Sequence, residues 1–309
     1  MKKYDVIIIG AGPAGCTAAV YCGRAELKAA MFERFAPGGQ MATTTEIENY
    51  PGFPNGVDAV QLAMDMSAQA ERFGAETVYD DAVALREEKG LKIITAASGE
   101  EYAANAVILA MGAAPRELGV KGEKELRGRG VSYCATCDGA FFRGKTVVVV
   151  GGGDTAAADA VFLSKICEKV YLVHRRDKLR AAKVYEKKLR ELSNVEFVWD
   201  TTVTAIEGEG KVGSVTLQNV KSGEVSTIAT DAVFVAVGVK PTTEWLKGTV
   251  DMNDAGFIIA DESTETSMAG VFAAGDCRVK LLRQVITAAS DGAVAAYMAE
   301  EYITRSRRW

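Results

Sequence analysis

The clearest chemical signal in this sequence is Cys134-Ala-Thr-Cys137, two cysteines with two residues between them. Such a pair can be a redox-active dithiol, half of a zinc site, or incidental. A purely structural disulfide is disfavoured, because we expect a cytosolic protein, in which thiols are kept reduced, and because the closed loop would be very short. The neighbouring motifs, two nucleotide-binding patterns, favour a redox-active pair.

Zinc is the main alternative, and it needs about four ligands, commonly two cysteine pairs or cysteines with histidines. His174 is the single histidine of the chain, and it lies in a basic run that suits a phosphate. The remaining cysteines form no second C-x-x-C pair; they are Cys16, Cys22, Cys167 and Cys277. We therefore expect no metal, and we expect these thiols to pack as small apolar side chains. For Cys277, which follows Asp276, a position near a ligand is the alternative.

Thiol–disulfide chemistry also requires a proton donor for the thiolate that leaves. The lone histidine lies on a strand assigned to nucleotide binding, so another group must serve. Asp138 directly follows Cys137 and is the nearest titratable candidate. We interpret Asp138 as the acid, with capping of the following turn as the alternative.

The elements that must position this chemistry form a repeat. Tyr4 to Ile9 is a predicted strand, followed by the glycine turn Gly10-Ala-Gly-Pro-Ala-Gly15 and an alanine-rich helix. Val147 to Val150 is a second predicted strand, followed by Gly151-Gly-Gly-Asp-Thr-Ala156 and another helix. Each unit then reaches a further strand. This strand, glycine turn and helix is the context in which a dinucleotide diphosphate binds to the free N–H groups of a helix N-terminus.

The ends of the second strands distinguish the two turns. Glu33 ends the first, where a carboxylate can accept hydrogen bonds from a ribose diol and would repel a 2′-phosphate. His174-Arg175-Arg176 ends the second at the matching position, with Arg180 one helical turn further. Guanidinium groups there suit a 2′-phosphate. The first turn therefore predicts FAD or NAD and the second NADPH, with a glycine-rich corner or a solvated strand end as the alternatives.

Composition agrees with a globular protein of about two domains at roughly 150 residues each. The chain has 309 residues, of which 48% are hydrophobic, and a formal net charge of -5. These values exclude long disorder and argue against a nucleic-acid binder, which would need a positive excess. The uncharged stretch from Val6 to Gly23 contains too many glycines for a spanning helix, so we expect no membrane association.

Regions of short alternating strands at about 77–106 and 195–231 predict β-meanders. Each precedes a buried-looking strand that ends in Gly-x-x-Pro, at Gly112 and Gly238. The connections near 113–120 and 241–248 are the candidate domain boundaries.

Taken together, these motifs resemble the low-molecular-weight, prokaryotic-type thioredoxin reductases, and the resemblance covers essentially the whole chain. It is carried by GAGPAG (10–15), PGGQ followed by TTTEIENYPG (37–52), CATCD (134–138), GGGDTA (151–156), HRRDKLR (174–180) and FAAGDCRVKLLRQVITAASDG (272–292). One departure is Ala157-Ala158-Asp159, where Val-Glu-Glu or similar is commoner. The departure weakens claims about contacts there and leaves the class unchanged.

The resemblance implies an α/β fold with two Rossmann-like, three-layer nucleotide-binding domains, each with a β-meander. The FAD domain would comprise residues 1–116 and 244–309, with the NADPH domain, residues 117–243 and carrying the C-x-x-C motif, inserted into it. For FAD the implied contacts are Gly10, Gly12, Pro13, Ala14, Gly15, Glu33, Gly39, Gln40, Asn49, Gly275, Asp276, Arg283, Gln284 and Val285. For NADPH they are Gly151, Gly153, Asp154, Thr155, Ala156, His174, Arg175, Arg176 and Arg180.

The implied reaction passes a hydride from NADPH to FAD, then two electrons to the Cys134–Cys137 disulfide, and then reduces thioredoxin by dithiol–disulfide exchange. Cys137 would face the flavin, and Cys134 would attack thioredoxin. The family is cytosolic and homodimeric, and its NADPH domain rotates between half-reactions. Alternatives are a related flavin reductase or dithiol oxidase acting on another thioredoxin-like protein or small dithiol, and a non-enzymatic flavin-binding redox sensor.

Overall fold

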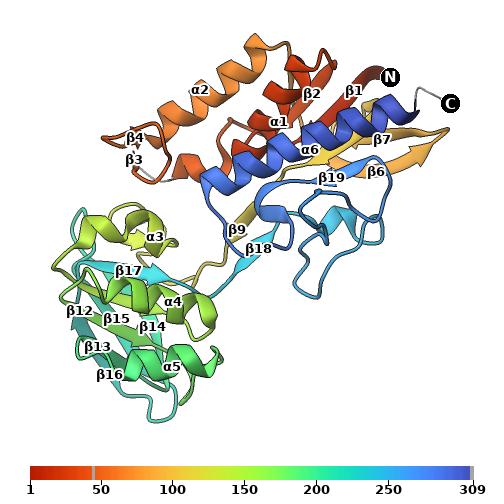
Figure 1. Cartoon of the computed structure of the whole chain (residues 1–309). Helices are drawn as coiled ribbons and strands as arrows, with labels where there is room; N and C mark the ends of the chain where they lie inside the picture. Colours follow the sequence, from red (N-terminus) through yellow and green to blue (C-terminus); the bar gives the residue numbers. More distant parts are fainter. Residues whose placement is uncertain (44–45, 307–309) are drawn as a thin grey trace. The chain divides into compact units, whose positions relative to one another are not determined.

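The computed structural model describes residues 1–43 and 46–306. The chain forms two compact units (Figure 1). Unit 1 comprises Met1–Ala114 and Lys240–Trp309, so it is built from both ends of the chain, and unit 2 is Pro115–Val239. Two short strands, β9 (Ala113–Pro115) and β18 (Val239–Pro241), pair with each other where the chain passes between the units.

Unit 1 is centred on a seven-stranded sheet in the order β5-β2-β1-β8-β7-β6, with β19 paired to β8. Parallel pairing joins β1 (Lys2–Ile9), β2 (Ala29–Glu33), β5 (Glu76–Tyr79), β8 (Glu101–Leu109) and β19 (Val271–Ala273). The inner strands read as continuous apolar runs because both of their faces are buried. The antiparallel strands β6 (Ala82–Glu88) and β7 (Leu91–Ala96) extend the sheet from β8.

Among residues 1–43 and 46–306, the α-helices of unit 1 are α1 (Pro13–Arg24), α2 (Ala59–Arg72) and α6 (Val285–Ser306). Proline at its first position suits the start of α1, and the Asp58 side chain caps α2 by accepting a hydrogen bond from the Gln61 N–H at 2.8 Å. A Cβ added to Gly292 of α6 would collide with the carbonyl of Ala14 in α1, so the backbones of α1 and α6 pack directly against each other. The smaller elements are η1 (Gly39–Thr43), β3 (Glu46–Ile47), β4 (Val57–Asp58), η3 (Glu244–Leu246) and η4 (Gly275–Cys277).

Unit 2 has a five-stranded parallel sheet in the order β10-β17-β11-β12-β13. Its strands are β10 (Val131–Ser132), β17 (Ala232–Val235), β11 (Thr146–Val150), β12 (Lys169–Val173) and β13 (Val195–Val198). The helical elements are α3 (Ala135–Asp138), η2 (Gly139–Phe142), α4 (Asp154–Leu163) and α5 (Lys183–Arg190). An antiparallel three-stranded sheet follows, made of β14 (Thr201–Glu207), β15 (Ser214–Asn219) and β16 (Val225–Ala229).

The predicted α/β class with two Rossmann-like units is confirmed. The strand, glycine turn, helix and parallel strand occur as β1, α1 and β2 in unit 1 and as β11, α4 and β12 in unit 2. The predicted meanders begin too early, however. β5 and β13, which the ranges 77–106 and 195–231 overlap, pair in parallel with β2 and β12 instead. Strand partners lie far apart in sequence, so a short apolar run does not reveal which neighbour it joins.

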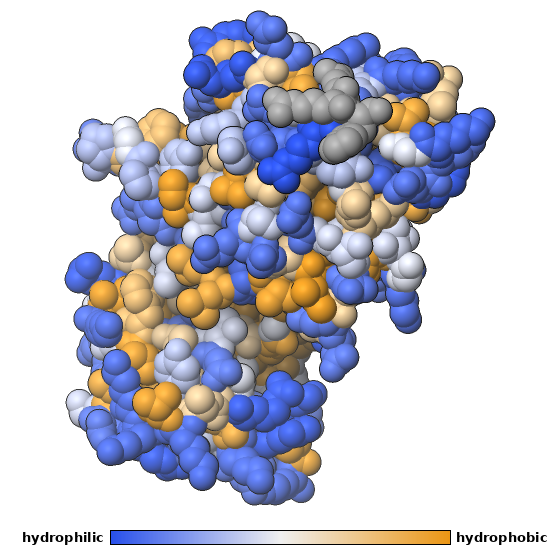
Figure 2. All heavy atoms as spheres, turned by 45° about the vertical axis from the view of Figure 1, so that its right-hand side comes forward, coloured by the Kyte–Doolittle hydropathy of each residue, from blue (hydrophilic) through white to orange (hydrophobic). Residues whose placement is uncertain are grey.

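Polar and apolar side chains are interspersed over the face shown in Figure 2. In the described part of the chain, no helix combines the length and apolar character that a membrane span requires. Among the large apolar side chains that are exposed there, Phe141 belongs to η2, directly after the C-x-x-C helix, and Leu281 precedes α6.

Candidate active site

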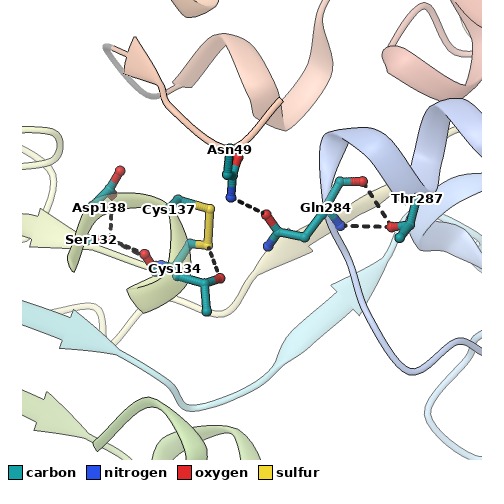
Figure 3. Close-up of a disulfide and its surroundings, with 8 residues drawn as sticks. Asn49, Ser132, Cys134, Cys137, Asp138, Gln284 and Thr287 are labelled. Carbon is teal, nitrogen blue, oxygen red and sulfur yellow. Dashed lines mark hydrogen bonds between the residues drawn. A yellow bond between two sulfur atoms is a disulfide. The ribbon is translucent and has the colours of Figure 1, made fainter. Parts of the chain in front are cut away.

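The two cysteines of the C-x-x-C motif form a disulfide in unit 2, as predicted (Figure 3). Cys134 is the N-cap residue of α3, and Cys137 lies within that helix. Ala135 between them is buried in the same apolar cluster as residues of α4, such as Ala160, whereas both cysteines are half-buried. The short helix is thus anchored to the core by its apolar residue, while its sulfur atoms remain partly accessible.

A buried hydroxyl beside the disulfide joins Asp138 to the backbone of Cys134. Ser132 is the last residue of β10, and its Oγ lies 2.6 Å from Asp138 Oδ2. The same Oγ accepts a hydrogen bond from the Cys134 N–H at 3.1 Å and lies 3.3 Å from the Cys134 carbonyl oxygen. Figure 3 shows this arrangement. Ser132 was not identified from the sequence, because no motif marks a serine two residues before a cysteine as functional.

A second residue that the sequence did not reveal is Glu123, which is 1% exposed. Its carboxylate accepts hydrogen bonds from the N–H groups of Leu118 and Gly119 at 2.8 and 2.7 Å, and from the Tyr133 hydroxyl at 2.9 Å. Burial and this bond raise the pKa of Tyr133, and the Arg127 guanidinium lies 4.9 Å from its ring centroid. Glu123 therefore connects the start of unit 2 to the residue that immediately precedes the disulfide.

The other four cysteines are buried free thiols, as expected from the sequence. Burial raises the pKa of Cys16, of Cys22 and of Cys277 to about 12, and that of Cys167 to about 11. Cys277 donates from its Sγ to the Leu109 carbonyl, at 3.2 Å. These thiols stay protonated at neutral pH and are poor nucleophiles, so redox chemistry is left to the C-x-x-C pair.

The first glycine turn connects β1 to α1 in unit 1. Gly10 has a φ of 106°, and a Cβ there would lie 2.6 Å from the Ala110 carbonyl oxygen, so the position requires glycine. Gly12 is the N-cap of α1 and leaves the first N–H groups of the helix without a side-chain cap. A Cβ on Gly15 would collide with the Gly10 carbonyl, which shows how closely the helix packs on the turn.

Glu33, at the end of β2, lies against this turn. One of its carboxylate oxygens, Oε2, accepts a hydrogen bond from the Ala11 N–H at 3.2 Å. The other, Oε1, accepts from the N–H groups of Arg34 and Phe35 at 2.8 and 3.2 Å. The Gly38 N–H donates to the Ala11 carbonyl at 2.8 Å, which brings the start of η1, with Gly39 and Gln40, beside the same turn.

The C-terminal segment of the predicted flavin site lies in the same unit. Gly275 and Asp276 form η4, and a Cβ on Gly275 would lie 3.0 Å from the Ala14 Cβ at the start of α1. Burial raises the pKa of Asp276, and the positive charges of Lys280 and Arg283 oppose that rise. Asn49 donates to Gln284 Oε1 at 2.9 Å (Figure 3). Val285 begins α6. η4 is thus brought beside the start of α1, and Asn49 and Gln284 are joined although they lie far apart in the sequence.

A buried ionic cluster fixes the loop that carries Asp276. Asp291 of α6 accepts a hydrogen bond from the Gly275 N–H at 2.9 Å. The Arg278 guanidinium binds both of its oxygens at 2.8 Å, and Lys280 Nζ lies 2.9 Å from Oδ2. Burial alone would raise the pKa of Asp291, but the hydrogen bonds from these two cations hold it below its ordinary value.

The second glycine turn connects β11 to α4 in unit 2. A Cβ on Gly151 would collide with the Ala236 carbonyl, whereas the space beside Gly153, the N-cap of α4, is open. Ala156 is fully buried beneath the turn, and Thr155 is exposed. Asp154 accepts a hydrogen bond from the Ala182 N–H at 2.8 Å, which ties the start of the helix to the segment after the basic run.

The basic run divides into one buried and three exposed side chains. His174 is 5% exposed; its ring packs under Gly152, where any Cβ would collide with it, and burial lowers its pKa. Arg175, Arg176 and Arg180 are exposed. The Arg180 N–H donates to the Gly152 carbonyl at 2.6 Å, so the run folds back to the turn. The arginines are therefore exposed near the second turn, and the imidazole packs beneath it.

Two buried polar atoms stand out among residues 1–43 and 46–306. Asp276 Oδ1 in unit 1 and His174 Nε2 in unit 2 are the only buried side-chain nitrogen or oxygen atoms of this set that lack a hydrogen-bond partner. A buried polar atom without a partner costs about 1–3 kcal/mol, so natural structures rarely keep one without a reason. One such atom accompanies each glycine turn, which fits a polar ligand at each.

Comparison with known proteins agrees with this geometry. The family model described as pyridine nucleotide-disulphide oxidoreductase matches residues 4–292. A thioredoxin reductase of Bacillus subtilis is 49% identical over 303 residues, which is 98% of this chain and 95% of the relative. A thioredoxin reductase of Listeria innocua is 47% identical over 98% of this chain and 94% of its own length.

Solved structures give the same result. A thioredoxin reductase from Streptococcus pyogenes aligns with a TM-score of 0.93 at 43% identity, over 98% of this chain and 99% of that one. A thioredoxin reductase from Giardia duodenalis aligns with a TM-score of 0.93 at 41% identity, over 98% and 100%. With a redox disulfide, two nucleotide-type turns and relatives matched over nearly their whole length, this chain belongs to the pyridine nucleotide-disulphide oxidoreductase family, among the thioredoxin reductases.

Proposed function

We propose that this protein is a thioredoxin-disulfide reductase that uses NADPH and FAD. The observation that carries the proposal is the Cys134–Cys137 disulfide, held half-buried in the unit that also contains the second glycine turn. Neither a nucleotide-binding scaffold nor a disulfide alone would specify the reaction. Together, in a chain that matches thioredoxin reductases over nearly its full length, they support electron transfer from a nicotinamide to a protein disulfide.

FAD would be held by unit 1. Its diphosphate fits the N-terminus of α1, where the turn from Gly10 to Gly15 leaves backbone N–H groups without side-chain caps. Glu33 would accept from the ribose, and the unpaired Oδ1 of Asp276 would accept from a polar group of the cofactor. Further contacts on the same unit are proposed for Pro13, Ala14, Gly39, Gln40, Asn49, Arg283, Gln284 and Val285.

NADPH would be held by unit 2. The open N-terminus of α4 at Gly153 suits its diphosphate. The exposed guanidinium groups of Arg175, Arg176 and Arg180 suit the 2′-phosphate, which a carboxylate in that place would repel. His174 would contact NADPH from beneath the turn through its Nε2, which has no hydrogen-bond partner among the described residues.

When bound, FAD would supply the redox chemistry that carries two electrons from NADPH to the Cys134–Cys137 disulfide. Cys137 would be the sulfur that faces the flavin, and Cys134 the thiolate that attacks the disulfide of thioredoxin. Cleavage of that disulfide releases a thiolate, which takes up a proton, and Asp138 next to Cys137 is the proposed donor. The exposed ring of Phe141, in the element that follows Asp138, offers apolar surface to a protein partner.

The proposed cycle includes a rotation of unit 2, because the dithiol must serve both a flavin and a bulky protein. Two relatives at 41% identity align with very different TM-scores, 0.93 for the Giardia duodenalis structure and 0.68 for a Lactococcus lactis structure described as the FR conformation. This difference supports a cycle in which the two units change their arrangement. The paired strands β9 and β18 are the proposed hinge.

Thioredoxin or a thioredoxin-like protein is the proposed partner, and we propose a cytosolic homodimer. The direct test is NADPH oxidation by purified, FAD-loaded protein with a panel of oxidised thioredoxins as acceptors. We expect turnover with at least one of them and much slower turnover with NADH. Turnover on oxygen or on small disulfides alone, with no thioredoxin reduced, would contradict the assignment.

A further inference from the structure

The hydroxyl of Ser132 has three polar atoms within hydrogen-bond distance. It lies 2.6 Å from a carboxylate oxygen of Asp138, receives the Cys134 N–H at 3.1 Å, and lies 3.3 Å from the Cys134 carbonyl (Figure 3). The residue is 5% exposed. Two possible acceptors and one fixed donor therefore surround one hydroxyl, which has a single proton to give and two lone pairs to receive.

The carboxyl group of Asp138 has two protonation states, and this hydroxyl satisfies both. When Asp138 is a carboxylate, Ser132 donates its proton to Oδ2. When Asp138 is protonated, its O–H donates to Ser132 Oγ, and the Ser132 proton turns to the Cys134 carbonyl oxygen. In both states Oγ keeps the hydrogen bond from the Cys134 N–H. The heavy atoms need not move, since only the hydroxyl proton rotates.

We propose that Ser132 is a positioning residue that holds Asp138 in place as it gives a proton to the thiolate released from the substrate disulfide. This proposal rests on the proposed thiol–disulfide reaction and on Asp138 as its acid. A carboxyl group tied to a fixed neutral partner would be displaced when it loses its proton. Ser132 changes from acceptor to donor at the same position, so the acid is held equally before and after the transfer.

The Cys134 thiolate forms a new bond to one sulfur of the substrate disulfide, and the bond between the two substrate sulfurs breaks, so the second sulfur leaves with the electron pair as a thiolate. Asp138 transfers its proton to that thiolate and becomes a carboxylate. Ser132 keeps its own proton and redirects it to Asp138. Solvent then returns one proton to Asp138 before the next turnover.

The proposal predicts that Ser132 matters only when the leaving sulfur needs a proton. An aryl disulfide such as dithiobis(nitrobenzoate) releases an acidic thiol that leaves readily as a thiolate, whereas bis(hydroxyethyl) disulfide and oxidised thioredoxin release alkyl thiols, whose ordinary pKa is about 8.5. The ratio of aryl to alkyl disulfide reduction therefore isolates proton donation from everything else that Ser132 could do.

The experiment compares wild type, Ser132→Ala, Asp138→Asn and the double variant, as FAD-loaded protein with NADPH and as protein whose dithiol has been reduced beforehand and desalted. For Ser132→Ala we expect alkyl disulfide reduction to fall about 10- to 100-fold, the effect of losing a hydrogen bond to a charged group, with aryl reduction within about 2-fold of wild type. Adding Ser132→Ala to Asp138→Asn should cost little more, because the two side chains act as one unit.

Two controls separate positioning from loss of structure. Ser132→Thr retains the hydroxyl and should restore most of the alkyl rate. Thr230→Val removes a different buried hydroxyl of unit 2, one that donates to the Thr146 and Ala232 carbonyls, and it should leave the aryl-to-alkyl ratio unchanged. If Ser132→Ala does not fold, Ser132→Gly carries the same expectation.

An equal fall in aryl and alkyl reduction, or no fall in either, would overturn the proposal. So would a full additional loss in the double variant. The comparison of two small disulfides needs no thioredoxin. If wild type reduces both small disulfides but no thioredoxin, the proposed function fails while the test of Ser132 remains valid.

Discussion

The two glycine turns have the same local architecture and different surroundings. In unit 1 the carboxylates beside the turn are fixed by hydrogen bonds. Glu33 is tied to the backbone by three of them, and the loop of Asp276 is held by the buried cluster around Asp291. In unit 2 the cationic side chains beside the turn, Arg175 and Arg176, are exposed. The difference suits a cofactor that stays bound in unit 1 and one that binds and leaves with each cycle in unit 2.

The largest effect on this comparison should come from Asp291→Asn. The variant leaves Arg278 and Lys280 buried without a carboxylate, which typically costs about 3–5 kcal/mol. We expect the denaturant concentration at which half of unit 1 is unfolded to fall sharply, as measured by release of the flavin. Asp231→Asn, in unit 2, removes a half-exposed carboxylate that lies 4.0 Å from Lys145 and should cost less than about 1 kcal/mol. Similar losses in the two variants would show that the cluster does not hold unit 1.

The same cluster predicts a pH dependence. In the folded protein the pKa of Asp291 lies below its ordinary value of about 3.9. The Asp291 carboxylate therefore stabilises the fold fully when the pH is above about 3.9. This stabilisation is lost as the pH falls through the lowered pKa. The stability difference between wild type and Asp291→Asn should therefore shrink in acid. A difference that grows as the pH falls would contradict this sign.

A smaller effect is expected on the exposed side of the comparison. Arg175→Ala/Arg176→Ala should weaken NADPH binding by about 10- to 150-fold, the effect of losing about 1.5–3 kcal/mol of charge-assisted hydrogen bonding, and should leave NADH nearly unaffected. Because these groups are exposed, the wild-type preference should weaken with salt. If the ratio of NADPH affinity to NADH affinity is unchanged, these arginines do not bind the 2′-phosphate. Lys183→Ala/Lys187→Ala on α5 is the control for general loss of positive charge.

The smallest effect should be that of Asp276→Asn, and its sign should depend on FAD. Burial raises the pKa of Asp276. In the FAD-free protein, the ionised carboxylate therefore reduces stability when the pH is above this raised pKa. The effect disappears when the pH falls well below the ordinary pKa of an aspartate. The variant should therefore stabilise FAD-free protein at neutral pH, yet weaken FAD retention about 10-fold. Thermal denaturation with and without FAD measures both, and loss of stability in both forms would exclude a ligand role for the unpaired oxygen.

Much of this architecture could be predicted because its signals are local. The glycine turns and the C-x-x-C pair are short motifs whose residue types carry their own chemistry, and the Cys134–Cys137 disulfide and the fold class are confirmed. The meander limits were wrong because pairing of β5 and β13 depends on distant strands. Ser132, Glu123 and Asp291 were missed for the same reason: their importance comes from partners that only the folded chain supplies.

His174 illustrates a further limit of sequence reasoning. The basic run predicts that all its members face a phosphate, but the structure buries the imidazole beneath Gly152 and exposes the arginines. A motif gives the residue types at a site but not how deeply each side chain is buried. The burial of His174 depends on its packing with Trp199, whose ring centroid lies 6.4 Å from that of His174. The roles of His174 and Asp138 stay predictions.

In the proposed reaction, one chain holds two electron acceptors, a flavin in unit 1 and the Cys134–Cys137 disulfide in unit 2. Anaerobic titration of the FAD-loaded protein with dithionite, followed by flavin absorbance and by counting free thiols, tests it directly. Wild type should take up two electron pairs per chain and gain two thiols, whereas Cys134→Ser/Cys137→Ser should take up one pair, still reduce its flavin with NADPH, and lose thioredoxin reduction by at least about 1000-fold. Uptake of a single pair by wild type, or thioredoxin turnover by the double variant, would contradict the account.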